Sequence, residues 1–394
     1  MLKLKLCFVD YAPMDYTPES PYQTPLGGSQ SALCYLSAAL AERGHLITLL
    51  NHTQTPGCWR GVDCLTLPEE PGEFFASQAF DAVISLNSLE PMQTIRPFLS
   101  PRTPMLLWTQ HAIDQPAVAP LRHRLIHQSW DHFICVSQWQ RATYLHAFAI
   151  EPERISVRLN AIGTPFHYLF PDRAALASGK AKTPTLAYTS TPGRGLSILV
   201  DLFPLLREIF PQLQLKVFSS MQTWQQSEDD PWLQDLYARC RATENLTLMG
   251  SLSQPELARE LAQIHLLAYP NIYNETSCIA LMEAMACGCD IVTTALGALP
   301  ETSSGYARLV DPGPGNTYVK RYFSALLDAL MLWLNEPQTV LSRLTRQVLF
   351  ANTRYTWQVR VWEWESLLYQ LCRNGGRHYW PPSVPVPPEL MPFS

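Results

Sequence analysis

Short apolar runs alternate with segments of helical periodicity through the first part of the chain. The runs that predict strands are Leu4–Val9, Leu46–Leu50, Ala82–Leu86, Met105–Trp108, Phe133–Val136 and Ile155–Leu159. Apolar residues at helical spacing predict helices over Gln30–Arg43 and Gln138–Phe148. Gly44 follows the first helix, at the position where a helix end favours glycine. Strands that alternate with helices pair in parallel, so this part of the chain predicts a parallel sheet.

The alternation stops over Thr164–Pro184, which holds three prolines and no sustained period, and then resumes. Later strands are predicted at Leu186–Thr189, Leu215–Phe218, Leu246–Met249, Leu266–Tyr269, Ile291–Thr294 and Ala307–Val310. The accompanying helices are predicted at Leu196–Ile209, Gln254–Gln263, Ser277–Cys287 and Thr356–Tyr369. Ser253 and Glu256 have the spacing of a capping box in front of the second of these helices.

The two sets of strands predict an α/β fold with two doubly wound, Rossmann-like domains that face a cleft. A length of 394 residues also favours two domains. We expect an N-terminal domain over 1–165, a linker over 166–184 and a C-terminal domain over 185–352. A helix over 353–373 could pack back on the N-terminal domain, and a proline-rich tail follows over 374–394. In such sheets ligands bind beyond the C-terminal ends of the strands.

Composition narrows the classes of partner. The formal net charge is −5 and no block of Lys or Arg occurs, which argues against a nucleic-acid partner. The ten scattered cysteines show no zinc-ligand spacing and indicate reduced thiols in a cytoplasmic protein. No apolar run is long enough for a membrane span. Peripheral contact with a membrane stays open, because the many Trp and Tyr residues could serve it or serve the cores.

The stretch NETSCIALMEAMACG places the carboxylate of Glu283 inside an apolar run, where burial is costly without a partner. A helix that begins near Ser277 would present free N–H groups from Thr276, Ser277 and Cys278, which is an anion site. Glu283 would lie about 10 Å further along the helix axis. A ligand with a phosphate on the helix tip could then place a ribose diol on Glu283. The alternative is an exposed Glu on an amphipathic helix.

Several segments together resemble the retaining GT-B glycosyltransferases of family 4. Glu275 and Glu283 match the Glu-x7-Glu motif of that family, and PNIYNETSCIALMEAMACGCDIVTT is similar to its donor-site segment. Weaker similarity is carried by PLGGSQSALCYLSAALAERGH, YTSTPGRGLSIL, FICVSQWQR, NAIG and MGSL. The resemblance spans roughly residues 1–370 and implies a GT-B fold and transfer of a sugar from a nucleotide-sugar donor.

The resemblance also implies roles for the donor-side residues. Glu283 would hold the nucleotide ribose, and Glu275 would bind hydroxyls of the donor sugar. The N–H groups of Thr276 and Ser277 would meet the sugar or the diphosphate. Arg194 would neutralise the leaving diphosphate, so that no metal and no other cofactor is expected. Taken without the resemblance, Arg194 could be a surface residue that flanks a helix.

Three further positions follow from the same resemblance. Gly28 would let the backbone approach the diphosphate closely, and Leu252 would lie beside the base. His111 matches the family histidine near the reacting carbons of the sugar, although a histidine at a strand end is often structural. The chain departs from the family where a second basic residue is usual, because Ser190 or Thr189 stands there.

We therefore expect a retaining, metal-independent hexosyl- or other glycosyltransferase that uses a UDP-, GDP-, ADP- or TDP-linked sugar. The acceptor could be a glycan, a lipid, a protein or a small molecule, since the loops of the N-terminal half carry no readable code. One alternative is a non-catalytic relative that binds a nucleotide sugar or scaffolds an assembly, with Ser190 as its mark. Another is a GT-B epimerase or phosphorylase.

Overall fold

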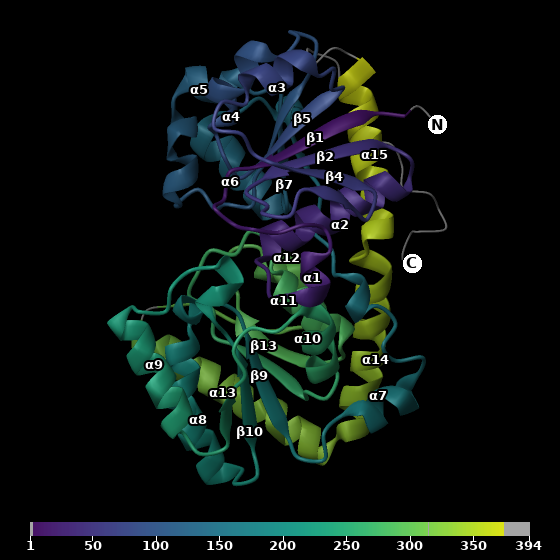
Figure 1. The fold of residues 1–394 in the computed structure, drawn as a ribbon. Coiled ribbons are helices and arrows are strands. Elements are labelled where there is room, and N and C mark those ends of the chain that lie inside the picture. The colour runs from purple at the N-terminus through teal and green to yellow at the C-terminus, as the bar shows by residue number, and fades with distance from the viewer. Residues whose placement is uncertain (1–2, 314, 374–394) are drawn as a thin grey trace. The chain divides into compact units, whose positions relative to one another are not determined.

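The computed structural model describes residues 3–313 and 315–373 (Figure 1). The chain forms two compact units. Among the described residues, unit 1 takes in 3–19, 32–160 and 356–373, and unit 2 takes in 20–31, 161–313 and 315–355. The units are described separately below.

Unit 1 is built, within the described residues, on an eight-stranded sheet of order β3-β4-β2-β1-β5-β6-β7-β8. Its strands are β1 (Lys5–Asp10), β2 (Leu46–Asn51), β3 (Gly57–Trp59), β4 (Val62–Thr66), β5 (Ala82–Leu86), β6 (Met105–Trp108), β7 (His132–Cys135) and β8 (Ile155–Val157). All neighbours pair in parallel except β3 and β4. The central strands β5, β6 and β7 are buried at every position, which explains why they read as unbroken apolar runs in the sequence.

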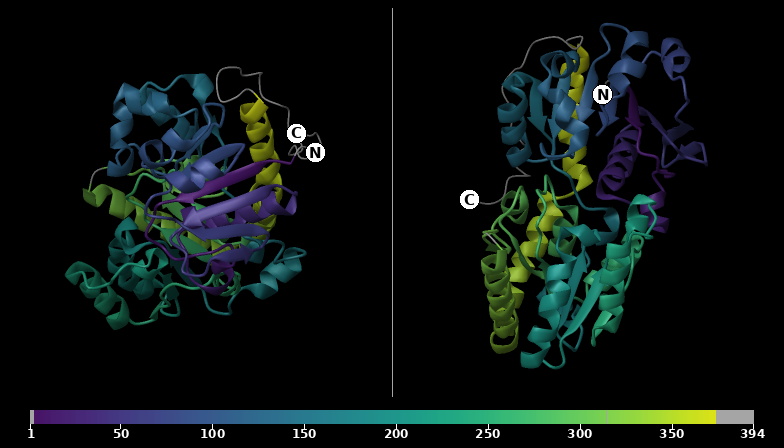
Figure 2. Two further views of the ribbon diagram at one scale, coloured as in Figure 1. Left: turned by 45° about the horizontal axis from the view of Figure 1, so that its top comes forward. Right: turned by 90° about the vertical axis from the view of Figure 1, so that its left-hand side faces the viewer.

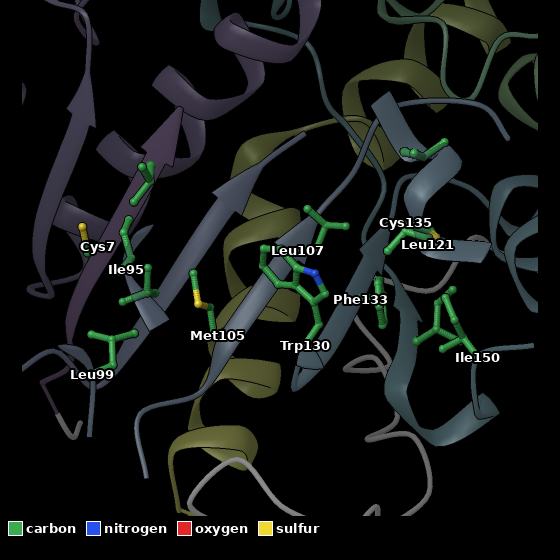
Figure 3. Close-up of a cluster of buried hydrophobic side chains, with 14 of the residues drawn as sticks. Cys7, Ile95, Leu99, Met105, Leu107, Leu121, Trp130, Phe133, Cys135 and Ile150 are labelled. Atoms are coloured by element: carbon green, nitrogen blue, oxygen red, sulfur yellow. The ribbon is translucent and has the colours of Figure 1, made fainter. Parts of the chain in front are cut away.

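Helices cover both faces of this sheet. They are α2 (Gly28–Glu42), α3 (Gly72–Ser77), α4 (Pro91–Thr94), α5 (Arg124–Ser129), α6 (Gln138–Phe148) and α15 (Trp357–Arg373), with 3₁₀ turns at η1 (Arg96–Phe98), η2 (Pro116–Arg122) and η3 (Pro152–Arg154). The first residues of α2 group with unit 2. Figure 3 shows one part of the core, in which Met105, Leu107 and Phe133 of neighbouring strands meet Trp130.

The last described helix, α15, lies beside the strands of unit 1 (Figure 2, yellow). Its Trp364 ring meets the Trp108 ring edge-on at 4.9 Å between centroids and lies 6.4 Å from the Phe8 ring. Its Glu365 Oε1 forms a 2.6 Å ion pair with Arg43 Nε and lies 2.9 Å from His45 Nε2. The helix therefore closes the core of unit 1 with aromatic contacts and a buried carboxylate.

Unit 2 holds, in its described part, a six-stranded parallel sheet of order β11-β10-β9-β12-β13-β14. Its strands are β9 (Thr185–Thr189), β10 (Gln214–Phe218), β11 (Leu246–Leu248), β12 (Leu266–Tyr269), β13 (Asp290–Thr294) and β14 (Arg308–Val310). From β9, the strands β10 and β11 follow on one side, and β12, β13 and β14 follow on the other side. The point of reversal lies between β9 and β12, where doubly wound sheets open a crevice at the carboxyl ends of the strands.

The helices of unit 2 and their turns complete the fold. They are α1 (Ser20–Gln23), α7 (Arg173–Gly179), α8 (Leu196–Ile209), α9 (Pro231–Ala242), α10 (Gln254–Leu261), α11 (Ile279–Ala286), α12 (Leu299–Ser303), α13 (Gly315–Asn335) and α14 (Pro337–Arg354), with 3₁₀ turns η4 (Thr164–Phe166), η5 (Pro192–Arg194) and η6 (Met221–Trp224). The predicted capping box of Ser253 and Glu256 starts α10, and Gly44 has the predicted left-handed backbone at φ 93°.

The structure confirms the α/β fold class with two Rossmann-like units. It differs from the predicted boundaries in three places. The segment predicted as a linker over 166–184 contains α7, and the helix predicted over 353–373 is the end of α14 followed by α15. Residues 20–31 group with unit 2 although they lie inside the range expected for the N-terminal domain. The proline-rich tail over 374–394 lies outside the described residues. No helix in the described ranges is long and apolar enough to cross a membrane.

Candidate functional site

Two loops meet at the point of strand reversal in unit 2. The loop after β9 carries Arg194 and Gly195, and the loop after β12 begins at Pro270. Gly195 has φ 106°, and a Cβ on it would lie 2.1 Å from the Pro270 carbonyl oxygen. Only glycine accepts both this backbone conformation and this approach. The glycine therefore fixes the two loops against each other, and with them Arg194.

Glu275 receives two short hydrogen bonds on one of its oxygens. Arg194 Nη1 donates to Glu275 Oε1 at 2.6 Å, and the Tyr269 hydroxyl donates to the same oxygen at 2.6 Å. The side chain of Glu275 is 6% exposed and that of Arg194 is 27% exposed. Within the described residues Glu275 Oε2 accepts no hydrogen bond. The family resemblance implied separate roles for Arg194 and Glu275, and the structure brings the two side chains into direct contact.

Arg194 also lies over an aromatic ring. Its guanidinium carbon is 4.5 Å from the centroid of the Tyr273 ring, which is a cation–π distance. Burial alone would lower the pKa of Arg194, but the Glu275 carboxylate raises it, and the net shift is upward. Arg194 is therefore a fixed positive charge at the crevice at every pH at which the protein is folded.

The loop after β13 supports the backbone of Glu275. Ala298 N–H donates to the Glu275 carbonyl at 2.7 Å. Gly297 has φ 62°, and a Cβ on it would lie 2.4 Å from that carbonyl oxygen. Glu275 N–H donates to the Tyr273 carbonyl at 2.9 Å. The carboxylate thus projects from a backbone that is held on both sides.

Glu283 lies on α11 and is only 5% exposed. Its Oε1 accepts one hydrogen bond, from Gln254 Nε2 at 3.3 Å, and in the described part of the chain it has no ion-pair partner. Burial raises the pKa of Glu283 to about 8. This carboxyl is therefore mostly protonated at neutral pH. Among the described residues, no cation offsets the cost of burying its charged form. Such an unpaired buried acid is a candidate ligand-binding group.

The N-terminus of α11 begins later than predicted. Cys278 is the N-cap residue, with an extended backbone at φ −88° and ψ 94°, and the helix proper starts at Ile279. The first helical hydrogen bond runs from Met282 N–H to the Cys278 carbonyl. The helix was predicted to begin near Ser277, and the structure begins it two residues later, so Thr276 and Ser277 precede the cap residue Cys278. The predicted role of their N–H groups as an anion site stays a prediction. The Ser277 hydroxyl oxygen is buried and has no hydrogen-bond partner among the described residues.

Two weaker predictions fall in the same unit. Gly28 groups with unit 2, and a Cβ on it would lie 3.5 Å from Ile279 Cδ1 of α11. Leu252 lies half-buried in the loop between β11 and α10, two residues before Gln254, the partner of Glu283. The structure thus places both residues near α11 or its contacts, while their roles toward a nucleotide stay predictions.

His111 belongs to unit 1 and follows β6. Its backbone carbonyl accepts from Gln140 Nε2 at 2.9 Å and from the Tyr144 hydroxyl at 2.8 Å. Its ring Nδ1 is buried without a hydrogen-bond partner among the residues that the structure describes. Burial lowers the pKa of His111, so the imidazole is neutral at neutral pH. Its predicted position near a donor sugar is not tested, because the other predicted site residues lie in unit 2.

Sequence reasoning missed the residues that hold the predicted ones in place. Tyr269 donates a hydrogen bond to Glu275, and Gln254 donates one to Glu283. Gly195 allows the close approach to Pro270, and Gly297 allows the close approach to the backbone of Glu275. The tyrosine at the end of a buried strand reads as a core residue. The glycines carried a weak signal, since each lies in a loop that follows a predicted strand.

Residues 184–328 match the family described as group 1 glycosyl transferases. Arg194, Tyr269, Glu275 and Glu283 all lie inside the matched range. The fold of the chain is that of solved GT-B structures.

Two relatives of this chain are named for phosphatidylinositol-type lipids. One is a human protein, a component of the phosphatidylinositol N-acetylglucosaminyltransferase, which is 23% identical over 311 residues that cover 70% of this chain and 60% of the relative. The phosphatidyl-myo-inositol mannosyltransferase of Propionibacterium freudenreichii subsp. shermanii is 27% identical over 169 residues, which cover 43% of this chain and 38% of the relative. The chain thus spans less than two thirds of the length of either relative.

The GT-B fold is also that of a solved structure with a bound nucleotide sugar. The HepE protein from Anabaena, in complex with UDP-glucose, matches with a TM-score of 0.68 and 17% identity. The match covers 93% of this chain and 100% of that protein. At this identity the likeness shows the fold alone.

Proposed function

We propose that the protein is a retaining glycosyltransferase that moves a sugar from a nucleotide-sugar donor to an acceptor hydroxyl. The observation that carries the proposal is the contact of Arg194 with Glu275 at the point of strand reversal in unit 2, together with the buried Glu283 on α11. The group 1 match over residues 184–328 supports it. Each of these three residues suits a different part of the donor: Glu283 the ribose, Arg194 the diphosphate and Glu275 the sugar.

The donor would lie along α11. The carboxyl of Glu283, which has no cation beside it among the described residues, binds the ribose hydroxyls. Both hydroxyls of a diol donate to a carboxylate, so the bound ribose stabilises the ionised form of Glu283. Arg194 and the N–H groups at the start of α11 face the diphosphate, where a helix N-terminus and a guanidinium both favour negative charge. Glu275 Oε2, which accepts no hydrogen bond from the described residues, accepts from hydroxyls of the donor sugar.

Transfer breaks the bond between the sugar carbon and the diphosphate oxygen and forms a bond between that carbon and the acceptor oxygen. The proton of the acceptor hydroxyl passes to the departing diphosphate oxygen. Negative charge grows on the departing diphosphate, and Arg194 stabilises that charge as a preorganised cation. We propose that no metal is needed for this step. The acceptor oxygen arrives on the same face of the sugar, so Glu275 does not act as a nucleophile, and its role is to orient the sugar.

The acceptor that we propose is a lipid with an inositol headgroup, since both curated relatives carry such a lipid in their names. A surface of unit 1 suits peripheral contact with an anionic membrane. Leu125 is 84% exposed and directly follows the exposed segment that holds Arg122 and Arg124. No Asp or Glu occurs from Gln115 to Trp130. Such contact would take place at the cytoplasmic face. Cosedimentation with phosphatidylserine vesicles should fall in Leu125→Ser, and unchanged cosedimentation would contradict this surface.

A donor screen tests the proposed function. UDP-, GDP-, ADP- and TDP-sugars are compared by the rise in melting temperature, because a ligand that binds only the folded state stabilises it. The sugar that gives the largest rise is then used for turnover with phosphatidylinositol vesicles, and the anomeric configuration of the product is determined by NMR. Retention of configuration is expected. Inversion would contradict the retaining mechanism.

The same assay separates the alternatives. A rise in melting temperature without turnover under any acceptor condition would favour a non-catalytic relative that binds a nucleotide sugar. A changed sugar without any acceptor would indicate an epimerase, and cleavage that depends on inorganic phosphate would indicate a phosphorylase. No binding of any nucleotide sugar would overturn the proposal.

A further inference from the structure

A chain of hydroxyl groups ends on the carboxylate of Glu275. The Tyr269 hydroxyl lies 2.6 Å from Glu275 Oε1, and Ser190 Oγ lies 3.3 Å from the Tyr269 hydroxyl. Tyr269 is buried at the end of β12, and its ring packs edge-on against Tyr188 at 5.8 Å between centroids. The hydroxyl therefore has a fixed place that the packing of the ring decides.

The direction of these hydrogen bonds follows from the chemistry of the groups. Burial and, after it, the charge of Glu275 raise the pKa of Tyr269, so the phenol keeps its proton at neutral pH. A carboxylate only accepts, so the single proton of Tyr269 points at Glu275. Ser190 must then donate to the Tyr269 oxygen. The protons run in one direction, from Ser190 through Tyr269 to Glu275.

Arg194 and Tyr269 bind the same oxygen of Glu275, but a bound nucleotide-sugar donor affects the two hydrogen bonds differently. A diphosphate carries more negative charge than one carboxylate and competes for the guanidinium of Arg194. A neutral phenol has one proton, already committed to Glu275, and does not compete for the diphosphate. In the occupied site Tyr269 is thus the partner that keeps Glu275 Oε1 in place while Arg194 serves the phosphate.

We infer that Tyr269 is a positioning residue for glycosyl transfer, which fixes Glu275 so that Oε2 points at the donor sugar, and that Ser190 orients the Tyr269 hydroxyl. The inference rests on the proposed function. It also gives a role to Ser190, which with Thr189 is one of the two residues that can correspond to the basic residue of the resembled family. A second cation there would compete with Tyr269 for Glu275, and a serine supports Tyr269 without adding charge.

The test compares two buried tyrosines in the same unit. Tyr269→Phe removes the hydroxyl that binds Glu275 and keeps the ring. The matched control, Tyr322→Phe on α13, removes a buried hydroxyl that donates to the Val292 carbonyl at 2.9 Å. The probes are UDP and UDP-glucose, or the corresponding pair for the sugar that the donor screen selects. Calorimetry gives both affinities, and initial rates give kcat and KM.

We expect Tyr269→Phe to bind UDP as the wild type does and to lose the additional affinity that the sugar confers. Its kcat should fall about 10- to 100-fold, the range that one hydrogen bond to a charged group typically contributes. Tyr322→Phe should keep wild-type kcat and sugar affinity at a similar loss of melting temperature. Because Tyr269 acts through Glu275, its substitution should have no further effect in a Glu275→Gln background.

Three outcomes would overturn the inference. They are unchanged kcat and sugar affinity in Tyr269→Phe, equal losses in Tyr322→Phe, and fully additive losses in the double variant with Glu275→Gln. An inactive wild type that binds UDP but gains nothing from the sugar would instead refute the proposed function, and the positioning role with it. If the wild type is active and Tyr269→Phe is just as active, only the positioning role is refuted.

Discussion

Glu283→Gln should stabilise the protein and weaken nucleotide binding at once. The substitution replaces a buried carboxyl with an amide of the same shape. Burial raises the pKa of Glu283 from the ordinary 4.5 to about 8. Between these two values the folded protein holds a proton that the unfolded chain has released. The free energy of unfolding must therefore fall as pH rises, by about 1.4 kcal/mol for each pH unit.

The size of the effect follows from the same two pKa values. At pH 7 the loss amounts to about 3 kcal/mol, and above pH 8 it levels off near about 5 kcal/mol. The amide has no proton to lose, so Glu283→Gln should be more stable than the wild type by about these amounts, with the difference vanishing below pH 5. Denaturant unfolding at pH 5, 6, 7 and 8 measures it.

Nucleotide affinity should change in the opposite direction. Without the carboxylate, the charge-assisted hydrogen bonds to the ribose are weakened, so calorimetry should show poorer binding of both the nucleoside diphosphate and the nucleotide sugar. The control Glu208→Gln removes an exposed carboxylate on α8 and should leave the affinity unchanged. If Glu283→Gln binds as tightly as the wild type, Glu283 does not contact the ribose. If it is less stable than the wild type at every pH, the account of its burial is wrong.

Substitutions at three further positions test the site. Arg194→Ala should lower the transfer rate on the order of 10²–10³-fold, and Arg194→Lys should recover only part of the rate, because a point charge cannot replace a planar fork. EDTA should leave the wild-type rate unchanged. An enzyme that EDTA inactivates and Mg²⁺ or Mn²⁺ restores would contradict the metal-free mechanism. Glu275→Ala should abolish turnover while calorimetry still shows binding of the nucleoside diphosphate, and loss of that binding would mean that Glu275 holds the loop instead of the sugar. Gly195→Ala should lower the free energy of unfolding by at least about 2 kcal/mol, because its Cβ would meet the Pro270 carbonyl at 2.1 Å; a stability in denaturant equal to the wild type would refute the close approach of the two loops.

The central strands of both sheets could be predicted because they are buried on both faces and read as continuous apolar runs. Helix α9 was missed because its sequence, Pro231–Ala242, carries many polar residues on an exposed face. The edge strand β3 and its neighbour β4 were missed because they are short and half exposed. In each case the signal in the sequence was weak because little apolar surface is buried.

The candidate site was predicted in part. The apolar neighbours of Glu283 correctly indicated its burial. The pairing of Arg194 with Glu275 could not be predicted, because 81 positions separate them and only the strand order brings β9 beside β12. The start of α11 was placed too early because Thr276 and Ser277 are residues that favour helix caps, while the backbone at Cys278 is still extended. The shared oxygen of Glu275 depends on side-chain geometry that no spacing encodes.

The position of helix α15 in the chain has a consequence for folding during synthesis on the ribosome. It covers Trp108 and Phe8 of unit 1 with Trp364, yet it is synthesised after all of unit 2 has been made. At ordinary translation speeds of roughly 5–20 residues per second, the chain from Ala161 to Tyr355 takes on the order of 10 to 40 s. For that time the strands of unit 1 present an uncovered aromatic face, which a chaperone or another nascent chain can occupy. The yield of folded protein should therefore depend on how quickly the chain reaches Trp364.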